Sequence, residues 1–144
     1  AETINEKSTV IDAEPLPAVK GIPFLLKQLF SNLIANSVKY ASPGRSPEIK
    51  ITASPVPMTY NGQDRQFYNV IHIADNGIGF EPQFAESIFN IFTKLHASSE
   101  YKGSGVGLAL CKKIMQNHKG YITAVSEPGK GTVISVYFPV NEKD

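Results

Sequence analysis

Several features that would assign a chain to a particular class of protein are scarce or missing in this sequence. Tryptophan is absent and Cys111 is the only cysteine among 144 residues. The chain therefore cannot form an internal disulfide, which is typical of a reducing compartment. No apolar run approaches the roughly 20 residues of a membrane-spanning helix, and residues 1–7 are too polar for a signal peptide. We expect a cytoplasmic domain without direct membrane contact, and leave open whether a longer parent protein is anchored in a membrane.

A strong excess of one charge is also lacking. Lysine and arginine number 14 against 13 aspartate and glutamate, a net charge of +1, so bulk charge gives no reason to expect nucleic acid as a partner. The length and the hydrophobic content of 42% suit one globular domain with a real core. We therefore predict a single domain over residues 1–144, in which residues 1–20 form an N-terminal strand and loop.

The most informative stretch present is Ala-Asp-Asn-Gly-Ile-Gly-Phe at residues 74–80, directly after an apolar run that predicts a central strand. A carboxylate at the end of a buried strand, here Asp75, can accept a hydrogen bond from an exocyclic amine. Gly77 and Gly79 allow a tight turn and a close approach of the backbone to a flat ligand. Alone, this pattern is usually only a turn.

A helix is predicted to begin at Pro23, because apolar residues then recur at three- and four-residue spacing until Pro43 and Gly44. Its other face carries a polar stripe made of Gln28, Asn32, Asn36, Lys39 and Tyr40. Asparagine is a poor helix former, so two of them one turn apart point to a function, although a solvated face is the alternative. An asparagine carbonyl suits Mg²⁺, and a nearby lysine can neutralise a phosphate.

A second glycine cluster follows a polar stretch without periodicity. Residues 93–104 have the length of a functional or disordered loop, and we interpret them as a mobile lid. Gly103, Gly105 and Gly107 then lead into an amphipathic helix, an arrangement that favours phosphate binding at the helix start. The Rossmann fingerprint, the Walker loop and the signatures of eukaryotic-type protein kinases are missing.

The remaining elements are predicted from alternation and turn residues. We expect an edge strand near Val10 and Ile11, a polar loop at 55–66, a short helical segment from 81 to about 90, and strands at 48–54, 67–74, 121–126 and 132–138.

Five motifs together carry a resemblance to a known family. NLIANSVKY at 32–40, DNGIGF at 75–80, IFNIFTKLH at 88–96, GSGVGLAL at 103–110 and SEPGKGT at 126–132 resemble, in this order and spacing, the ATP-binding catalytic domain of bacterial sensor histidine kinases. The sequence EYKGSGVGLALCKKI at residues 100–114 is similar to the phytochrome-like branch of this family. The resemblance implies an α+β fold, a two-layer α/β sandwich (the Bergerat fold) with a mixed, mostly antiparallel sheet of about five strands, about three helices and an ATP lid.

The resemblance also implies a role for individual residues. Asn36 would bind Mg²⁺, Asn32 would support the metal or the phosphates, and Lys39 and Tyr40 would lie near the phosphates and sugar. Asp75 would accept the adenine amine, with Gly77 and Gly79 leaving room for the base. The other nucleotide-binding residues would be Phe92, Lys94 near the γ-phosphate, Lys102, Gly103, Ser104, Gly105, Val106, Gly107, Leu108 and, beside adenine, Thr132.

Three positions depart from the usual family pattern. Ser37 replaces a small apolar residue, and Lys119 precedes Gly120 where two glycines are usual. Lys94 stands where arginine is frequent in the family. A lysine ammonium is a point charge and cannot bind a phosphate through two parallel hydrogen bonds as an arginine guanidinium can, so a weaker contact with the γ-phosphate is expected.

Related ATPases place a water-activating glutamate one turn before the metal-binding asparagine, and here that position is Asn32, which cannot act as a general base. We therefore expect a protein-histidine kinase domain that uses Mg-ATP and transfers the γ-phosphoryl group to a histidine on a separate dimerisation domain. None of His72, His96 and His118 has the sequence context of an acceptor. The expected partners are that upstream domain and a downstream response regulator, with a monomeric isolated domain and a homodimeric full-length protein. The alternatives are a serine kinase of the anti-sigma type and a regulatory module that binds nucleotide without transfer.

Overall fold

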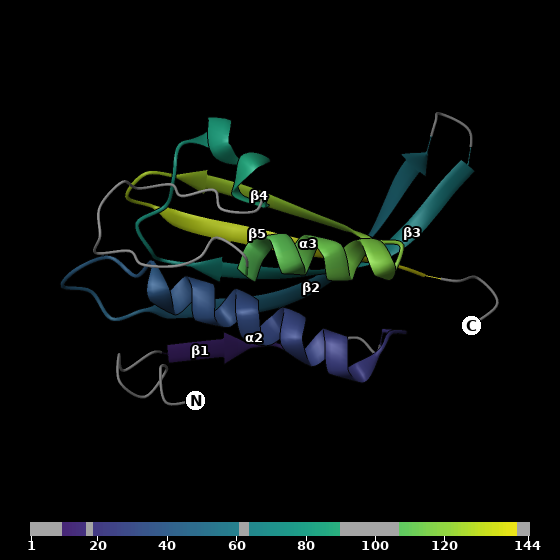
Figure 1. Cartoon of the computed structure of the whole chain (residues 1–144), viewed down its shortest axis with the longest axis horizontal. Helices are drawn as coiled ribbons and strands as arrows, with labels where there is room; N and C mark the ends of the chain where they lie inside the picture. The colour runs from purple at the N-terminus through teal and green to yellow at the C-terminus, as the bar shows by residue number, and fades with distance from the viewer. Residues whose placement is uncertain (1–9, 17–18, 61–63, 90–106, 141–144) are drawn as a thin grey trace.

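The computed structural model describes residues 10–16, 19–60, 64–89 and 107–140. Figure 1 shows a sheet with two α-helices lying side by side across one of its faces. The strands are β1 (Val10–Ala13), β2 (Glu48–Tyr60), β3 (Asp64–Asp75), β4 (Tyr121–Glu127) and β5 (Gly131–Pro139), and the helices are α2 (Pro23–Lys39) and α3 (Gly107–Asn117). The chain thus forms the predicted two-layer α+β sandwich.

The five strands follow the order β1-β2-β3-β5-β4. β1 pairs with β2 in parallel and the three other pairings are antiparallel, so the sheet is mixed and mostly antiparallel, as predicted. The predicted edge strand at Val10 and the central position of β3 are both confirmed. The register places Asp75 opposite Ile49 of β2 and Thr132 of β5, so that its side chain emerges where the central strand ends.

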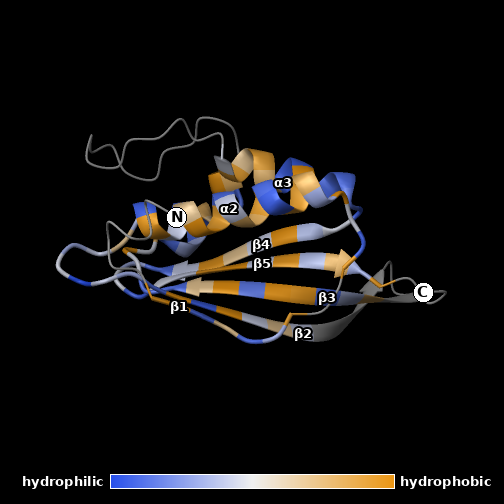
Figure 2. Ribbon diagram, turned by 90° about the horizontal axis from the view of Figure 1, so that it is seen from below, coloured by the Kyte–Doolittle hydropathy of each residue, from blue (hydrophilic) through white to orange (hydrophobic). Residues whose placement is uncertain are grey.

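The core lies between the sheet and the two helices. Alternating residues of the strands, such as Ile71 and Ile73, face Leu29 and Leu33 of α2, all at most 2% exposed. Figure 2 shows the helical layer lying over the sheet, with hydrophobic residues recurring in the helices and along the strands. Each fully buried side chain of this kind contributes about 1.5–3 kcal/mol relative to exposure. The three- and four-residue spacing of the hydrophobic residues along α2 thus determines which side of the helix is left for polar groups.

The structure differs from the sequence predictions in the type or length of three elements. The predicted helical segment from 81 to 90 is two short 3₁₀ helices, η1 (Pro82–Phe84) and η2 (Ser87–Phe89), so the described residues hold two α-helices rather than about three. Pro82 starts η1, and the single turns remain too short for an α-helix. α2 ends at Lys39, before Pro43 and Gly44, which were predicted to end it, and the Tyr40 N–H bonds to the carbonyls of Asn36 and Val38.

The largest difference concerns the predicted loop at 55–66. Most of it lies in β2 and β3, which pair beyond the rest of the sheet as a two-stranded ribbon, while residues 61–63 fall outside the described part (Figure 1). The polar residues of this stretch predicted a loop. The stretch also contains Pro55 and Pro57, but β1 pairs only as far as Ile51 of β2. Past that point β2 has no second neighbour among the described residues, and an edge strand tolerates proline because a missing N–H then need not break a ladder bond.

Candidate functional site

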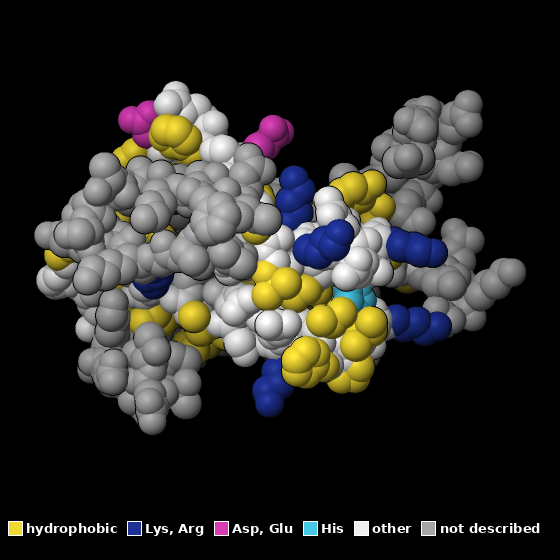
Figure 3. All heavy atoms as spheres, viewed as in Figure 1, with side chains coloured by type: hydrophobic (Ala, Val, Ile, Leu, Met, Phe, Trp, Pro, Cys, Tyr) yellow, Lys and Arg dark blue, Asp and Glu magenta, His cyan; other side chains and the backbone are white. Residues whose placement is uncertain are grey.

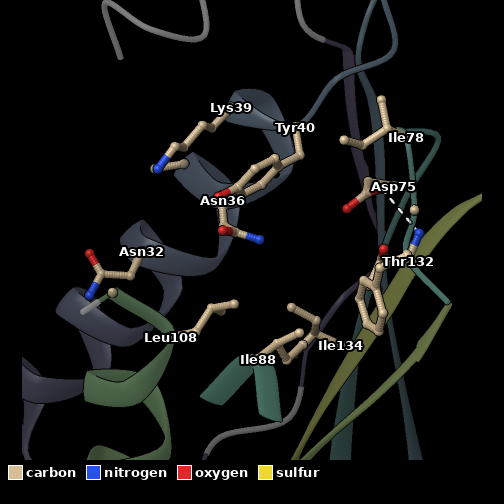
Figure 4. Close-up of a pocket in the computed structure, with 14 residues that line it drawn as sticks. Asn32, Asn36, Lys39, Tyr40, Asp75, Ile78, Ile88, Leu108, Thr132 and Ile134 are labelled. Atoms are coloured by element: carbon tan, nitrogen blue, oxygen red, sulfur yellow. Dashed lines mark hydrogen bonds between the residues drawn. The ribbon is translucent and has the colours of Figure 1, made fainter. Parts of the chain in front are cut away.

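A cavity of about 210 Å³ opens between the helical layer and one end of the sheet. Side chains from α2, the start of α3, the turn after β3 and the strand β5 surround it (Figure 4). Its lining consists of Asn32, Ala35, Asn36, Lys39, Tyr40, Asp75, Ile78, Gly79, Phe80, Ile88, Gly107, Leu108, Thr132 and Ile134. Motifs that are separated by up to 100 positions in the sequence therefore meet at one site.

Asp75 is held firmly on the sheet side of this cavity. Its Oδ1 atom accepts hydrogen bonds from the backbone N–H of Gly77 at 2.9 Å and of Thr132 at 3.2 Å. Burial raises the pKa of the carboxyl above its ordinary value, and the hydrogen bonds from Gly77, Ser37 and Thr132 oppose that rise. A carboxylate has about four lone-pair positions, so Asp75 retains capacity to accept a further hydrogen bond from a ligand.

The glycines of the turn after β3 are required by nearby backbone. A Cβ on Gly77 would lie 2.5 Å from the carbonyl oxygen of Tyr40, and a Cβ on Gly79 would lie 2.0 Å from that of Glu127. Gly79 also has a φ of +68°, in the left-handed region that side chains disfavour. These two residues let the turn pack between α2 and the β4–β5 hairpin. Gly79 lines the cavity, whereas Gly77 supports Asp75 from outside it.

The helix side of the cavity carries the predicted polar stripe. Asn36, Lys39 and Tyr40 all line the cavity, and Figure 4 shows the Asn36 amide pointing into the space between α2 and Asp75. The Lys39 ammonium lies 5.2 Å from the centre of the Tyr40 ring, within cation–π range. Burial raises the pKa of the Tyr40 hydroxyl, which therefore stays protonated at neutral pH. These three residues are half-buried and line the cavity, and their roles in binding stay predictions.

Asn32 lines the cavity one turn earlier and also contacts α3. Nearby, the thiol of Cys111 is fully buried and contacts the carbonyl oxygen of Leu29 at 3.8 Å. Burial raises the pKa of this thiol, and the Asn32 side chain opposes the rise.

Thr132 belongs to a hydrogen-bonded network beneath Asp75. The Thr132 hydroxyl lies 2.8 Å from the Ser126 hydroxyl. The Ser126 hydroxyl also accepts a hydrogen bond from the N–H of Phe80 at 2.9 Å and donates one to the carbonyl oxygen of Gly131 at 2.8 Å. The network fixes the β4–β5 hairpin against the turn that carries Asp75. Ser126 is 5% exposed and has a positioning role that the sequence pattern did not reveal.

The sequence also missed the apolar part of the lining. Ile78, Phe80, Ile88 and Ile134 surround the cavity together with Leu108, and Ala35 lies between the two asparagines. A signal existed for two of them, since Ile78 and Phe80 alternate with the glycines of the 75–80 motif. Side chains of this kind suit a flat, largely apolar ring system.

The predicted site residues fall into three groups. Nine line the cavity: Asn32, Asn36, Lys39, Tyr40, Asp75, Gly79, Gly107, Leu108 and Thr132. Gly77 lies behind it. Phe92, Lys94, Lys102, Gly103, Ser104, Gly105 and Val106, with the whole predicted lid at 93–104, are outside the described residues. Their roles stay predictions.

Neither a cluster of metal-binding side chains nor a membrane-spanning helix occurs among the described residues. No group of three or more histidine, cysteine, aspartate or glutamate side chains is arranged to hold a metal ion in this part of the chain. No helix within the same ranges combines the length and apolar character needed to cross a membrane.

Comparison with known proteins agrees with this geometry. The model of the family described as histidine kinase-, DNA gyrase B-, and HSP90-like ATPase matches residues 21–142. The phytochrome-like protein Cph1 of Synechocystis sp. is 42% identical over 139 residues, which are 96% of this chain and 17% of that protein. The chain thus spans about one sixth of the length of this relative. The similarity to a phytochrome-like protein agrees with the resemblance found in the sequence of residues 100–114.

Solved structures of similar fold are also found. The mycobacterial sensor histidine kinase MprB has a TM-score of 0.77 at 22% identity, covering 96% of this chain and 88% of that one. Full-length ShkA in complex with AMPPNP has a TM-score of 0.71 at 24% identity, covering 96% of this chain and 27% of that one. At these identities the likeness concerns the fold. The family match over residues 21–142 is decisive, and the chain belongs to the histidine kinase-, DNA gyrase B-, and HSP90-like ATPases as an ATP-binding domain of the sensor histidine kinase type.

Proposed function

We propose that this domain binds ATP with Mg²⁺ and supplies the γ-phosphoryl group to a histidine on a separate phosphoacceptor and dimerisation domain. The observation that carries the proposal is that Asp75, on the sheet, and Asn36 and Lys39, on α2, line one cavity. The Asp75 carboxylate suits the base of a purine nucleotide, and the Asn36 amide and Lys39 ammonium suit its phosphates and the metal ion bound to them.

The base would bind on the sheet side. Asp75 accepts a hydrogen bond from the exocyclic amine of adenine, next to the Thr132 hydroxyl, while Ile78 and Ile134 contact the ring. A keto group at the same position of the purine would instead place an acceptor against the Asp75 carboxylate. Adenine is therefore favoured over guanine, because an unpaired acceptor costs more than a missing contact.

The phosphates would lie toward α2 and the start of α3. Lys39 neutralises phosphate charge, and the first N–H groups of α3, which begins at Gly107, can donate to phosphate oxygens. Asn36 would hold Mg²⁺ through its carbonyl oxygen, with Asn32 in support. The ion supplies charge neutralisation on the transferred group. Phe92, Lys94 and the residues 102–106 complete this region in the proposal.

Transfer to a protein acceptor is favoured over hydrolysis. Asp75 is the only carboxylate among the described residues that line the cavity, and two backbone N–H groups hold it at the base end. Asn32 stands where a general base for water would be needed and cannot take a proton. Phosphoryl transfer requires positioning and charge neutralisation, both of which these residues can provide.

The partners belong to the same proposal. The acceptor histidine would lie on another domain of the longer protein, the phosphoryl group would pass to a response regulator, and the full-length protein would be a homodimer around a monomeric catalytic domain. A cytoplasmic location follows from the need for ATP.

The test begins with binding. Titration calorimetry with a non-hydrolysable ATP analogue and Mg²⁺ should give binding to the wild-type chain, and a loss of about 100-fold or more in Asp75→Asn and in Asn36→Ala. Wild-type affinity in either variant would refute the site.

Transfer is tested next, by mixing the chain with labelled ATP and the phosphoacceptor region of the longer protein. A label stable in base and lost in acid marks phosphohistidine. An acid-stable label would instead support the serine kinase, and tight binding without any transfer would support the regulatory module.

A further inference from the structure

Ser126 is a buried polar residue of β4 that lies behind the described lining of the cavity. It is 5% exposed. Its hydroxyl contacts the N–H of Phe80 at 2.9 Å, and the carbonyl oxygen of Gly131 and the hydroxyl of Thr132, both at 2.8 Å. A serine hydroxyl has one proton to donate and two lone pairs that accept. These three partners therefore use the whole hydrogen-bonding capacity of Ser126.

The direction of each hydrogen bond follows from the chemistry of the partner. A backbone N–H can only donate, so Ser126 accepts from Phe80. A carbonyl oxygen can only accept, so the single hydroxyl proton of Ser126 points to Gly131. The Thr132 hydroxyl is left as the donor to the second lone pair of Ser126. Because a threonine hydroxyl also has one proton, Thr132 has no hydroxyl proton to offer to the cavity.

Thr132 lines the cavity beside Asp75, and its own N–H donates to the Asp75 carboxylate at 3.2 Å (Figure 4). With its N–H and its hydroxyl proton both bonded within the protein, the Thr132 hydroxyl can only accept from a ligand. The ionised carboxylate of Asp75 can also only accept. The two residues thus place hydrogen-bond acceptors next to one another on the sheet side of the cavity, which suits a ligand group with two N–H bonds.

We propose that Ser126 is a positioning residue for purine specificity, which holds the Thr132 hydroxyl as an acceptor and thereby selects a 6-amino purine over a 6-keto purine. The proposal rests on the proposed ATP site and deepens it. Asp75 would accept one N–H of the exocyclic amine and Thr132 the other. A 6-keto oxygen would instead face lone pairs of both residues, and an acceptor left without a donor costs more than a missing contact.

The experiment compares Ser126→Ala with Ser135→Ala, a matched control on the neighbouring strand β5. Ser135 is also buried, and its hydroxyl lies 2.7 Å from Nδ1 of His72, outside the described lining of the cavity. Calorimetry measures the affinities for non-hydrolysable analogues of ATP and of inosine triphosphate, which has a 6-keto group. In Ser126→Ala the preference for the ATP analogue should fall about tenfold, because the freed Thr132 hydroxyl can turn its proton toward the keto oxygen. Ser135→Ala should keep the wild-type preference.

Thr132→Val tests the direction of the hydroxyl without a change at Ser126, and so does not depend on the folding of Ser126→Ala. It removes the hydroxyl and keeps the branched shape of the side chain. It should weaken binding of the ATP analogue about tenfold and should not weaken binding of the inosine analogue. In the Thr132→Val background, Ser126→Ala should not change the preference further, since Ser126 acts through that hydroxyl.

The outcomes separate the two proposals. The role of Ser126 would be overturned by an unchanged preference in folded Ser126→Ala, by an equal fall in Ser135→Ala, or by weaker binding of the inosine analogue in Thr132→Val. Each of these results would leave the ATP site intact. Failure of the wild-type chain to bind either analogue would instead overturn the proposed function.

Discussion

The imidazole of His118 joins the last turn of α3 to the residue before α2. Its Nε2 atom accepts the backbone N–H of Ile22 at 3.0 Å, and its Nδ1–H donates to the carbonyl oxygen of Ile114 at 2.8 Å. These bonds assign the neutral tautomer with the proton on Nδ1. A Cβ on Gly21 would lie 2.7 Å from the same ring. These contacts thus join α3 to the start of α2, at the end of the helical layer opposite the cavity. Figure 3 shows hydrophobic, histidine, and lysine or arginine side chains on the face of the molecule that the helices cover.

This link predicts coupled effects on stability. His118→Ala should lower the free energy of unfolding by about 2 kcal/mol, because it removes two hydrogen bonds and ring packing. Gly21→Ala should cost about 1–3 kcal/mol, because the new methyl group overlaps both the His118 ring and the Leu26 side chain, each 2.7 Å away. The double variant should lose less than the sum by about 1 kcal/mol, since truncating His118 makes room at Gly21.

Urea unfolding of the four proteins gives the coupling energy. Gln116→Ala, an exposed change on the same helix, is the control and should stay within about 0.5 kcal/mol of wild type. Strict additivity of the two substitutions would mean that the ring and Gly21 do not share space.

Two glycines with the same backbone conformation should differ sharply when replaced. Gly79 and Gly129 have φ of +68° and +80°, but a Cβ on Gly79 would meet the Glu127 carbonyl at 2.0 Å, whereas a Cβ on Gly129 meets nothing within 4 Å. Gly129→Ala should therefore cost only the conformational penalty of about 1 kcal/mol. Gly79→Ala should cost clearly more, about 3 kcal/mol, because backbone must move.

The same pair tests the site. Moving the turn at Gly79 displaces its neighbours around Asp75, so Gly79→Ala should weaken nucleotide binding at least tenfold under folded conditions, whereas Gly129→Ala should leave it unchanged. Thermal unfolding and calorimetric titration measure the two effects separately. Equal stability losses in both variants would contradict the close approach to Glu127.

Much of this arrangement could be predicted from the sequence, for identifiable physical reasons. The asparagines of α2 stood out because their residue type conflicts with helix propensity, and Asp75 stood out because it follows a buried strand. Local patterns also fixed the sheet's central strand. The long-range contacts could not be predicted in this way: Thr132 with Asp75, Ser126 with Phe80 and His118 with Ile22 depend on how elements distant in sequence meet.

The end of α3 predicts a stabilising substitution. Lys119 has a φ of +60°, and the following Gly120 N–H bonds to the carbonyl oxygen of Met115 at 2.9 Å, so Lys119 occupies the left-handed C-terminal position where glycine is favoured. Lys119→Gly should raise the free energy of unfolding by about 0.5–1 kcal/mol. The substitution removes the cost of the left-handed conformation, and part of this gain is offset because glycine increases the conformational entropy of the unfolded chain. Lys113→Gly, on the exposed side of α3, is the control and should cost about 1 kcal/mol. A loss of stability in both variants would show that Lys119 is not strained.

The buried thiol of Cys111 predicts how stability changes in alkali. Burial raises its pKa from 9.0 to about 12, with the Asn32 hydrogen bond opposing the rise. The folded state therefore keeps the proton that the unfolded chain releases. This contribution to stability is fully present below about pH 9 and is lost as the pH rises toward the folded-state value.

Between pH 9 and 10 the wild type should lose on the order of 1 kcal/mol more stability than Cys111→Ala, in which no thiol titrates. Urea unfolding of both proteins at several pH values measures this difference. The contributions of lysine and tyrosine titration are the same in the two proteins and drop out when their stabilities are subtracted. In the folded wild type a thiol-alkylating reagent at about pH 8 should react only at the rate of unfolding, since neither thiolate nor access is available. Parallel pH profiles for the two proteins, or rapid alkylation under native conditions, would mean that the thiol behind Asn32 is open to water.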